Sequence, residues 1–211
     1  SDLPDKVVIN DYCYLTKAQT LLYEKTLNEM MEKISGFTGV NRRGNIFKLI
    51  TSLKQICNHP YQFLKAGEMT KEMSGKMEKC IDLIRSIIEN EEKTLIFTQY
   101  KDMGDILTKI IADEFNETPL FFHGSLTVPQ REKLIEDFQT KDDNHVMVLS
   151  LKAGGTGLNL TKATNVIHYD LWWNPAVEEQ ATDRTYRIGQ TNNVMVHRMI
   201  TLGTFEEKID E

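Results

Sequence analysis

The chain has 211 residues, of which 40% are hydrophobic and 27% are charged, as in an ordinary globular domain. Its formal net charge of −6 argues against a protein that coats nucleic acid through bulk positive charge, but leaves room for a local groove that touches a few phosphates. No apolar run reaches the roughly 18 residues of a membrane span. No secretory signal is visible at the start, so we expect no membrane partner.

The first part of the chain predicts a strand followed by two helices. Residues 6–14 are rich in Val, Ile and Tyr, as is typical of a strand. Thr16 and Gln19 form a capping box that opens a helix through about Ile34. We expect residues 35–44 to form a flexible tip, and apolar residues at helical spacing from Ile46 to Cys57 to form a second helix. The domain boundaries we predict are an entry strand at 1–14, a helical hairpin insertion with a linker at 15–74, and a core at 75–211.

From residue 75 onward, strands alternate with helices. The predicted strands are 94–98, 120–122, 146–150, 166–169 and 194–200, and the helices between and after them include 77–88, 101–115, 127–138 and a last helix opened at Thr204. This alternation predicts an α/β fold with a mostly parallel sheet covered by helices on both faces. Ligands of such sheets bind in the loops at the carboxyl ends of the strands.

The cysteines and one glycine-rich segment exclude two kinds of site. Cys13, Cys57 and Cys80 are far apart among apolar neighbours, so we expect core thiols of a reducing compartment. Cys57 and His59 lack partner ligands at zinc spacing, so we predict no metal site. Residues 39–46 have the two glycines of a phosphate-binding P-loop, but lack its lysine and follow a helix, so we interpret them as part of the hairpin tip.

Residues 172–190 are the most informative segment. Asn174 can cap a helix, Pro175 suits its first position, and Gly189 is placed to end it. A helix of that length would put Gln180, Arg184 and Arg187 on one face, at positions i, i+4 and i+7. Arginine keeps its charge and offers a planar set of donors, which suits a developing phosphoryl charge.

An alternative for these two arginines stays open on the segment alone. They could be surface residues that pair with Glu179 and Asp183. The loops at the strand ends favour a phosphate site. Residues 150–160 carry Gly154, Gly155 and Gly157 with Thr156, a composition that lets backbone amides approach an anion.

Taken in order, these segments resemble the second RecA-like lobe of superfamily 2 helicases, specifically the Swi/Snf-type DNA-dependent ATPases. The matching motifs are residues 93–99 (motif IV), 123–131 (IVa), 150–159 (V) and 180–190 (VI). Trp173-Asn174-Pro175 and the ending Arg187-Ile-Gly-Gln190 distinguish this family from RNA helicases, as does Asp183 before the first arginine. The hairpin resembles the family's insertion, and the compactness of the chain is more similar to bacterial or archaeal members.

The resemblance implies half of an ATPase site. ATP with Mg²⁺ would be held mainly by an N-terminal RecA-like lobe of the same protein, because this chain has no P-loop and no magnesium-binding acidic pair. The resemblance assigns Arg184 and Arg187 as arginine fingers, Gln180 as a residue that places water or phosphate, and Gly157 and Asn159 as neighbours of the nucleotide. The full protein would then be an enzyme, whereas we expect these 211 residues alone to be inactive and to be a fragment of a longer chain.

The resemblance also implies double-stranded DNA as a partner. The residues it assigns to the DNA backbone are Thr98, Gln99, His123, Gly124, Ser150, Lys152 and Thr156, and Trp173 is its candidate for the duplex groove. Trp172 and Trp173 could equally be core aromatics. The rival function is a non-catalytic lobe that binds nucleic acid or protein. The expected location is DNA-associated, in the cytoplasm of a prokaryote or the nucleus of a eukaryote.

Overall fold

The structure, a computed structural model, describes residues 4–150, 158–172, 174–187 and 189–210. The chain divides into two compact units. The first unit comprises the residues up to Tyr12 together with Cys80–Ile200, and it contains most of the sheet. The second comprises Cys13–Lys79 together with the residues from Thr201 onward, and it contains the helical hairpin.

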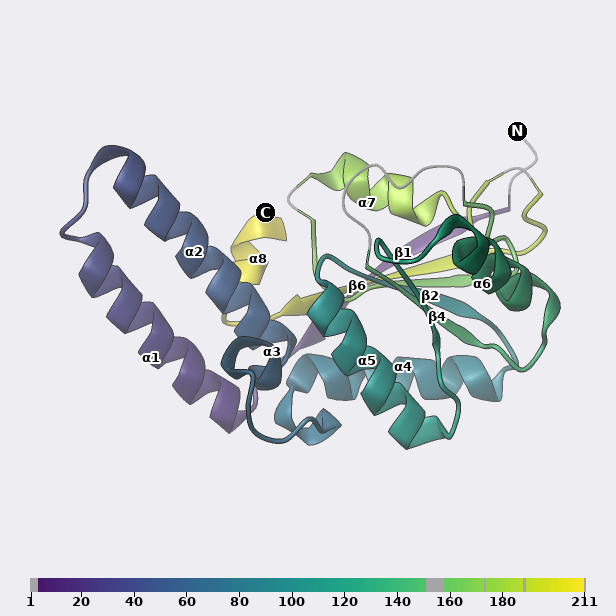
Figure 1. Ribbon diagram of the computed structural model, residues 1–211, viewed down its shortest axis with the longest axis horizontal. Coiled ribbons are helices and arrows are strands. Elements are labelled where there is room, and N and C mark those ends of the chain that lie inside the picture. The colour runs from purple at the N-terminus through teal and green to yellow at the C-terminus, as the bar shows by residue number, and fades with distance from the viewer. Residues whose placement is uncertain (1–3, 151–157, 173, 188, 211) are drawn as a thin grey trace. The chain divides into compact units, whose positions relative to one another are not determined.

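A single six-stranded sheet forms the centre of the first unit (Figure 1). In spatial order its strands are β1 (Lys6–Cys13), β6 (Val194–Thr201), β5 (Asn165–His168), β2 (Thr94–Thr98), β4 (Val146–Ser150) and β3 (Leu120–His123). The pairs β6–β5, β5–β2, β2–β4 and β4–β3 are all parallel. The predicted α/β fold is therefore confirmed, and every predicted strand exists within one or two residues of its expected bounds.

Helices cover both faces of this sheet, which explains why its central strands are apolar along their whole length. Every residue of β2 is buried. Figure 1 shows α4 (Gly75–Glu89) and α5 (Lys101–Phe115) on one face, and α6 (Val128–Thr140) and α7 (Pro175–Thr182) on the other. On the α6 and α7 face, Phe97 and Leu149 pack in one cluster with Phe138 of α6 and Ala181 of α7. These contacts pack α6 and α7 against the sheet.

Capping boxes begin two helices, and the one predicted at Thr16 is confirmed. Thr16 accepts the backbone N–H of Gln19 at 3.2 Å, and the Gln19 side chain accepts the N–H of Thr16 at 2.9 Å, which begins α1 (Lys17–Ile34). Thr127 and Gln130 make the same pair of bonds at 3.3 and 2.9 Å and begin α6. Each such cap contributes about 1 kcal/mol to helix stability.

The hairpin differs from its prediction at the tip. The second helix, α2 (Gly39–Asn58), begins six residues before Asn45, so the connection between α1 and α2 is shorter than 35–44. The prediction of a flexible tip was therefore wrong for residues 39–44. A glycine inside a helix costs only about 1 kcal/mol, which the packing of α1 against α2 can offset. The P-loop-like segment belongs to the hairpin, as predicted, but it is helical.

The residues after the hairpin are more ordered than a plain linker. A short helix, α3 (Pro60–Leu64), and a 3₁₀ turn, η1 (Lys71–Met73), lie between α2 and α4. The ring of His59 caps α3, with Nδ1 accepting from Tyr61 N at 3.0 Å and Nε2 bonding Thr70 O at 2.7 Å. His59 is thus a capping residue. All three cysteines are buried and free, as predicted.

A buried ion pair closes the second unit. Lys76 Nζ lies 2.8 Å from Glu206 Oε2, and both side chains are at least 97% buried. Glu206 belongs to the last helix, α8 (Phe205–Asp210), and its other oxygen accepts the N–H of Thr201 at 2.9 Å. Burial by itself would lower the pKa of Lys76, but the adjacent Glu206 carboxylate reverses this effect and the pKa is raised. Lys76 therefore stays protonated, and the pair joins α4 to α8.

Candidate functional site

The carboxyl edge of the sheet brings three of the predicted site residues together. Thr98 ends β2, Ser150 ends β4 and His123 ends β3. In the strand register, Thr98 lies opposite Ser150, and Ser150 lies opposite His123. The order follows from parallel pairing, which places equivalent strand ends at one edge. The strand register therefore places these three predicted residues side by side along that edge.

An aspartate that was missed in the sequence organises the loop after β2. Thr98 Oγ1 donates to Asp170 Oδ2 at 2.6 Å, and the backbone N–H of Gln99 donates to Asp170 Oδ1 at 2.8 Å. Gln99 Nε2 also donates to Leu171 O at 2.5 Å. Thr98 and Asp170 are both 1% exposed, so the Thr98 hydroxyl serves this internal network. Asp170 follows a buried strand, which is a signal that could have found it.

The loop after β3 is held by the imidazole ring of His123 and by an arginine. His123 Nδ1 accepts the N–H of Ser125 at 3.3 Å, and the imidazole tilts against Phe121. Burial lowers the pKa of His123, and the charge of Lys101 lowers it further. Arg131 Nη2 donates to Gly124 O at 3.1 Å. His123 is therefore a neutral capping side chain beside an exposed Gly124 at the strand end.

Helix α7 begins as predicted but ends early. Asn174 Oδ1 accepts the N–H of Ala176 at 3.0 Å, and Pro175 is the first helical residue. The helix ends at Thr182, seven residues before Gly189, so the prediction that Gly189 ends it was wrong. Gly189 instead lies in a later turn with a φ of +101°.

Backbone carbonyls that a longer α7 would use in its own hydrogen bonds accept hydrogen bonds from other groups instead. Leu160 N donates to Arg184 O at 3.0 Å, and Gln190 Nε2 donates to Thr185 O at 3.0 Å. After Thr182 the backbone continues through i to i+3 turns. The prediction of one shared helix face is therefore also wrong, since Gln180 and Arg187 are exposed whereas Arg184 is buried.

The two arginines have different surroundings. Arg184 is 6% exposed; its Nη1 donates to Gln180 O at 2.5 Å, and its buried Nε has no hydrogen-bond partner. Burial lowers the pKa of Arg184, Asp183 raises it, and the charge of Arg187 lowers it again. Arg187 Nη1 donates to Leu158 O at 2.8 Å. In the described part of the chain neither arginine forms an ion pair, which counts against surface pairing with Glu179 and Asp183.

A glutamate of the same helix is paired instead. Glu178 Oε2 accepts from Arg198 Nε at 2.8 Å, and Glu178 Oε1 accepts the N–H of Trp172 at 3.2 Å. Glu178 is buried, so this pair fixes α7 against β6. Glu178 and Glu179 therefore differ, since Glu178 is buried and paired whereas Glu179 is exposed.

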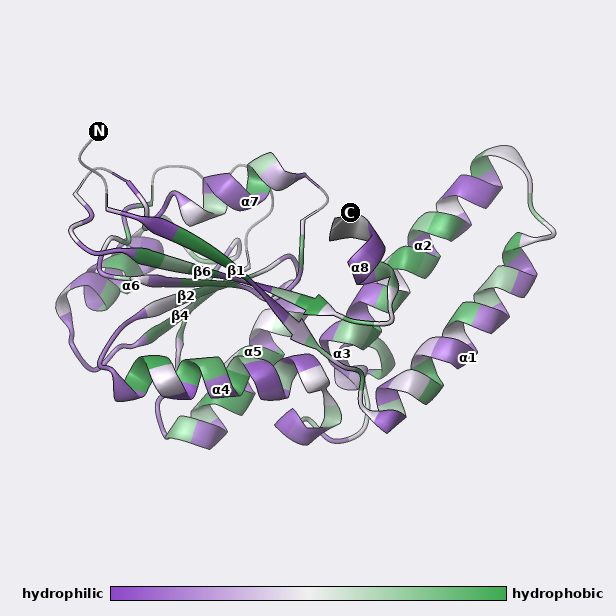
Figure 2. Cartoon of the chain, turned by 180° about the vertical axis from the view of Figure 1, so that it is seen from behind, coloured by the Kyte–Doolittle hydropathy of each residue, from purple (hydrophilic) through white to green (hydrophobic). Residues whose placement is uncertain are grey.

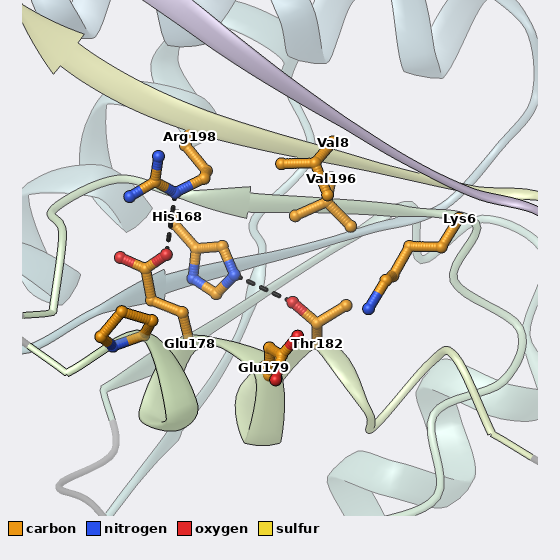
Figure 3. A pocket seen from close by; sticks show the side chains of 9 residues that line it. Lys6, Val8, His168, Glu178, Glu179, Thr182, Val196 and Arg198 are labelled. Carbon is orange, nitrogen blue, oxygen red and sulfur yellow. Dashed lines mark hydrogen bonds and ion pairs between the residues drawn. The ribbon is translucent and has the colours of Figure 1, made fainter. Parts of the chain in front are cut away.

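A cavity of about 350 Å³ lies between α7 and the strands β1, β5 and β6 (Figure 3). His168 lines it, with Nε2 3.1 Å from Thr182 Oγ1 and Nδ1 without a hydrogen-bond partner. Burial lowers the pKa of His168 to about 3, and the charge of Arg198 acts in the same direction. The imidazole is neutral at pH 7 and stacks on Phe97 with ring centroids 5.6 Å apart.

Gln190 is a second residue whose role the sequence did not reveal. It is 5% exposed, and Nε2 donates to three carbonyl oxygens, of Thr161 at 2.9 Å, Ala163 at 3.1 Å and Thr185 at 3.0 Å. The side chain thus joins the segment after residue 157 to the turn that follows α7 and carries Arg184 and Arg187. Nothing in the sequence pattern shows that this amide turns inward.

Several predicted residues lie outside the described part of the chain, namely Lys152, Thr156, Gly157 and Trp173. Asn159 is described and exposed. Among the described residues, no group of three His, Cys, Asp or Glu side chains is arranged to hold a metal ion. Within the same residues, no helix is long and apolar enough to cross a membrane.

The chain is similar to known helicase proteins. Residues 75–189 match the helicase conserved C-terminal domain. The chain is 47% identical over 212 residues to a putative ATP-dependent helicase/translocase, YwqA, of Bacillus subtilis strain 168, with 99% of this chain and 23% of the relative covered. The chain thus spans about a quarter or less of the length of the curated relatives it matches first.

Two solved structures have the same fold. The SWI2/SNF2 ATPase core of Sulfolobus solfataricus in complex with dsDNA has a TM-score of 0.90 and 45% identity, over 100% of this chain and 44% of that one. The C-terminal domain of the S. solfataricus SWI2/SNF2 ATPase has a TM-score of 0.85 and 40% identity, over 98% of this chain and 84% of that one. The chain therefore belongs to the helicase C-terminal domain family, as the C-terminal RecA-like lobe of the SWI2/SNF2 type.

Proposed function

We propose that this chain is the C-terminal motor lobe of an ATP-dependent translocase on double-stranded DNA. In this proposal Arg184 and Arg187 are arginine fingers, and an N-terminal RecA-like lobe of the same protein holds most of the ATP and its Mg²⁺. The observation that carries it is the buried guanidinium of Arg184, which has an unbonded Nε and no ion-pair partner among the described residues. A buried charge without a counter-charge is costly, and a bound polyphosphate would supply one.

The two arginines would have different roles in the reaction. Arg187 is exposed and held at Nη1 by Leu158 O, so its remaining donors can reach a phosphate at the surface. The buried Arg184 would add a second positive charge near the phosphate, further inside the protein than Arg187. The exposed Gln180 would orient the attacking water. Arginine fingers stabilise the charge that develops on the transferred phosphoryl group. Gly157 and Asn159 would lie beside the nucleotide, as the Swi/Snf resemblance implies.

The DNA contacts would come from the carboxyl edge of the sheet. We assign backbone contacts to Gln99, His123, Gly124 and Ser150, together with Lys152 and Thr156, and a groove contact to Trp173. The register of β2, β4 and β3 supports this row, and the DNA-bound S. solfataricus core supports a duplex as the substrate. Thr98 acts differently from its prediction here, because its hydroxyl positions Gln99 through Asp170.

The arginine assignment is tested by Arg187→Ala in the full-length protein. DNA-stimulated ATP hydrolysis should fall by about 10³-fold, as in other phosphoryl-transfer systems, with duplex affinity unchanged. Arg85→Ala is the matched control. Arg85 is a partly exposed arginine of α4 that pairs with Glu114, and it lies far in the sequence from the segment that contains Arg184 and Arg187. A variant that keeps its ATPase rate within about tenfold of the wild type would refute the finger role.

The rival reading, a lobe without catalysis, predicts a different result for the wild type. A full-length protein that binds duplex DNA but hydrolyses no ATP in its presence would establish it. Residues 1–211 alone should hydrolyse no ATP, and should bind DNA weakly with an affinity that falls steeply as salt rises.

A further inference from the structure

The first half of α2 presents an exposed surface that combines basic and apolar side chains. Val40, Arg43 and Phe47 follow the spacing i, i+3 and i+7, so they share one face, and Lys48 flanks it. Val40 is 78% exposed and Phe47 is 71% exposed, which is unusual for large apolar residues. Arg42 is exposed as well, but it projects from the opposite side of the helix, since it lies two residues after Val40. We refer to Val40, Arg43, Phe47 and Lys48 as the α2 basic face.

The charge of this region differs from that of the rest of the chain. The whole chain has 31 Asp and Glu in 211 residues, but residues 33–67 contain none. The same segment carries six basic residues, Lys33, Arg42, Arg43, Lys48, Lys54 and Lys65. Within the described chain, Arg42, Arg43 and Lys48 form no ion pair. A protein of net charge −6 therefore keeps a local positive potential on the hairpin.

The helix that carries this face is weakly stabilised by its own sequence. Its N-cap, Thr38, makes no side-chain hydrogen bond to the first turn. Gly39, Asn41, Gly44 and Asn45 are all poor helix formers. The buried side chains of α2 begin only at Leu49. The first ten residues thus lack a side-chain cap and contribute only the partly buried Ile46 to the hairpin core, and a partner that packs on them would stabilise them.

Figure 2 shows hydrophobic and hydrophilic residues alternating along α2 up to the hairpin tip. We infer that the α2 basic face docks an acidic amphipathic segment of a partner protein. The basic residues select an acidic partner and would speed its approach, since opposite charges raise association rates. The apolar pair selects a polypeptide over a nucleic acid, because Val40 and Phe47 need apolar side chains to leave water, whereas a phosphate backbone offers none. The inference rests on the hairpin alone and is independent of the arginine fingers.

The test measures binding of a labelled peptide to the full-length protein by fluorescence anisotropy. The probe is a helical peptide of about 20 residues, with Leu at i, i+3, i+4 and i+7 and Glu at the remaining positions. Two further probes serve as controls. One is a peptide of the same composition with the Leu residues dispersed, and the other is a glutamate homopolymer. Duplex DNA of about 20 base pairs serves as the competitor.

Two variants and one matched control locate the site. Val40→Ala with Phe47→Ala, and Arg43→Glu with Lys48→Glu, should each weaken binding of the amphipathic peptide by at least about tenfold. The control, Leu21→Ala with Lys25→Glu, makes the same kinds of change on exposed positions of α1 and should leave binding unchanged. Hydrogen exchange should slow at residues 39–48 when the peptide binds, and this readout reports the site without any substitution.

Three results would overturn the inference. The first is equal loss of binding in the α1 control, which would show that bulk charge attracts the peptide. The second is equal binding of the dispersed peptide, which would remove the role of Val40 and Phe47. The third is binding of the duplex to the hairpin with the same dependence on Phe47→Ala, which would make nucleic acid the occupant.

Discussion

Two buried cations in this chain have opposite surroundings. Lys76 in the second unit pairs with Glu206 at 2.8 Å and also donates to Asn58 Oδ1 at 3.3 Å. Arg184 in the first unit is nearly as buried, yet its Nε has no partner and no carboxylate of the described residues pairs with it. A paired buried charge is complete within the fold. A buried cation without such a pair leaves room for an anion from outside, and this difference separates a structural cation from a candidate functional one.

The largest effect on stability should come from removing the paired cation. Lys76→Met leaves the Glu206 carboxylate buried without its partner, which should lower the free energy of unfolding by about 3–5 kcal/mol. Urea denaturation measures this loss. Lys76→Met combined with Glu206→Leu should recover much of it, since the remaining unpaired charge is then removed. A double variant no more stable than the single one would mean that the ion pair is not the source of the loss.

A buried histidine extends the comparison to a neutral group. The folded pKa of His168 is about 3 and its ordinary value is 6.5. Below pH 6.5 the unfolded chain therefore binds a proton that the folded chain does not, so stability is lost as the pH falls from 6.5 towards 3. Between pH 7 and pH 5 this group should remove about 2 kcal/mol from the free energy of unfolding.

His168→Gln separates this contribution from that of other titrating groups. The loss of stability between pH 7 and pH 5, measured by urea titration at each pH, should be smaller in the variant than in the wild type. An identical pH dependence in both proteins would show that His168 takes up its proton in the folded state as well.

The smallest effect on stability should come from the unpaired cation. Arg184→Met removes a buried charge without leaving an opposite charge behind, so the free energy of unfolding should change by no more than about 1 kcal/mol. The same variant of the full-length protein should lose most of its DNA-stimulated ATPase rate if Arg184 is a finger. A loss of stability comparable to that of Lys76→Met would reveal a counter-charge for Arg184 and would undo the contrast.

The order of the elements could be predicted from the sequence because their signals are local. The capping boxes at Thr16 and Thr127 begin their helices where expected, and α5 has the predicted bounds. The row formed by Thr98, Ser150 and His123 follows from the same reasoning, since parallel strands that end in polar residues must bring them to one edge.

What could not be predicted depends on contacts between distant residues. Around and after the end of α7, Arg184 Nη1 donates to Gln180 O, Leu160 N donates to Arg184 O, and Gln190 Nε2 donates to Thr185 O. The spacing of residue types within 172–190 does not show these hydrogen bonds. The partnership of Lys76 with Glu206 joins positions 130 residues apart, so helical spacing could not reveal it.

The parallel sheet also decides where a reporter group can be attached. The loops that precede β2, β3 and β4 enter the sheet at the edge opposite Thr98, Ser150 and His123. Asp142 and Asp143, before β4, are exposed and acidic. A fluorophore on a cysteine introduced there would be distant from the strand ends proposed for DNA, whereas the three native thiols are buried and would react slowly. With a second dye elsewhere on the full-length protein, single-molecule energy transfer could then test whether this lobe moves when ATP is added, without an added group in the site.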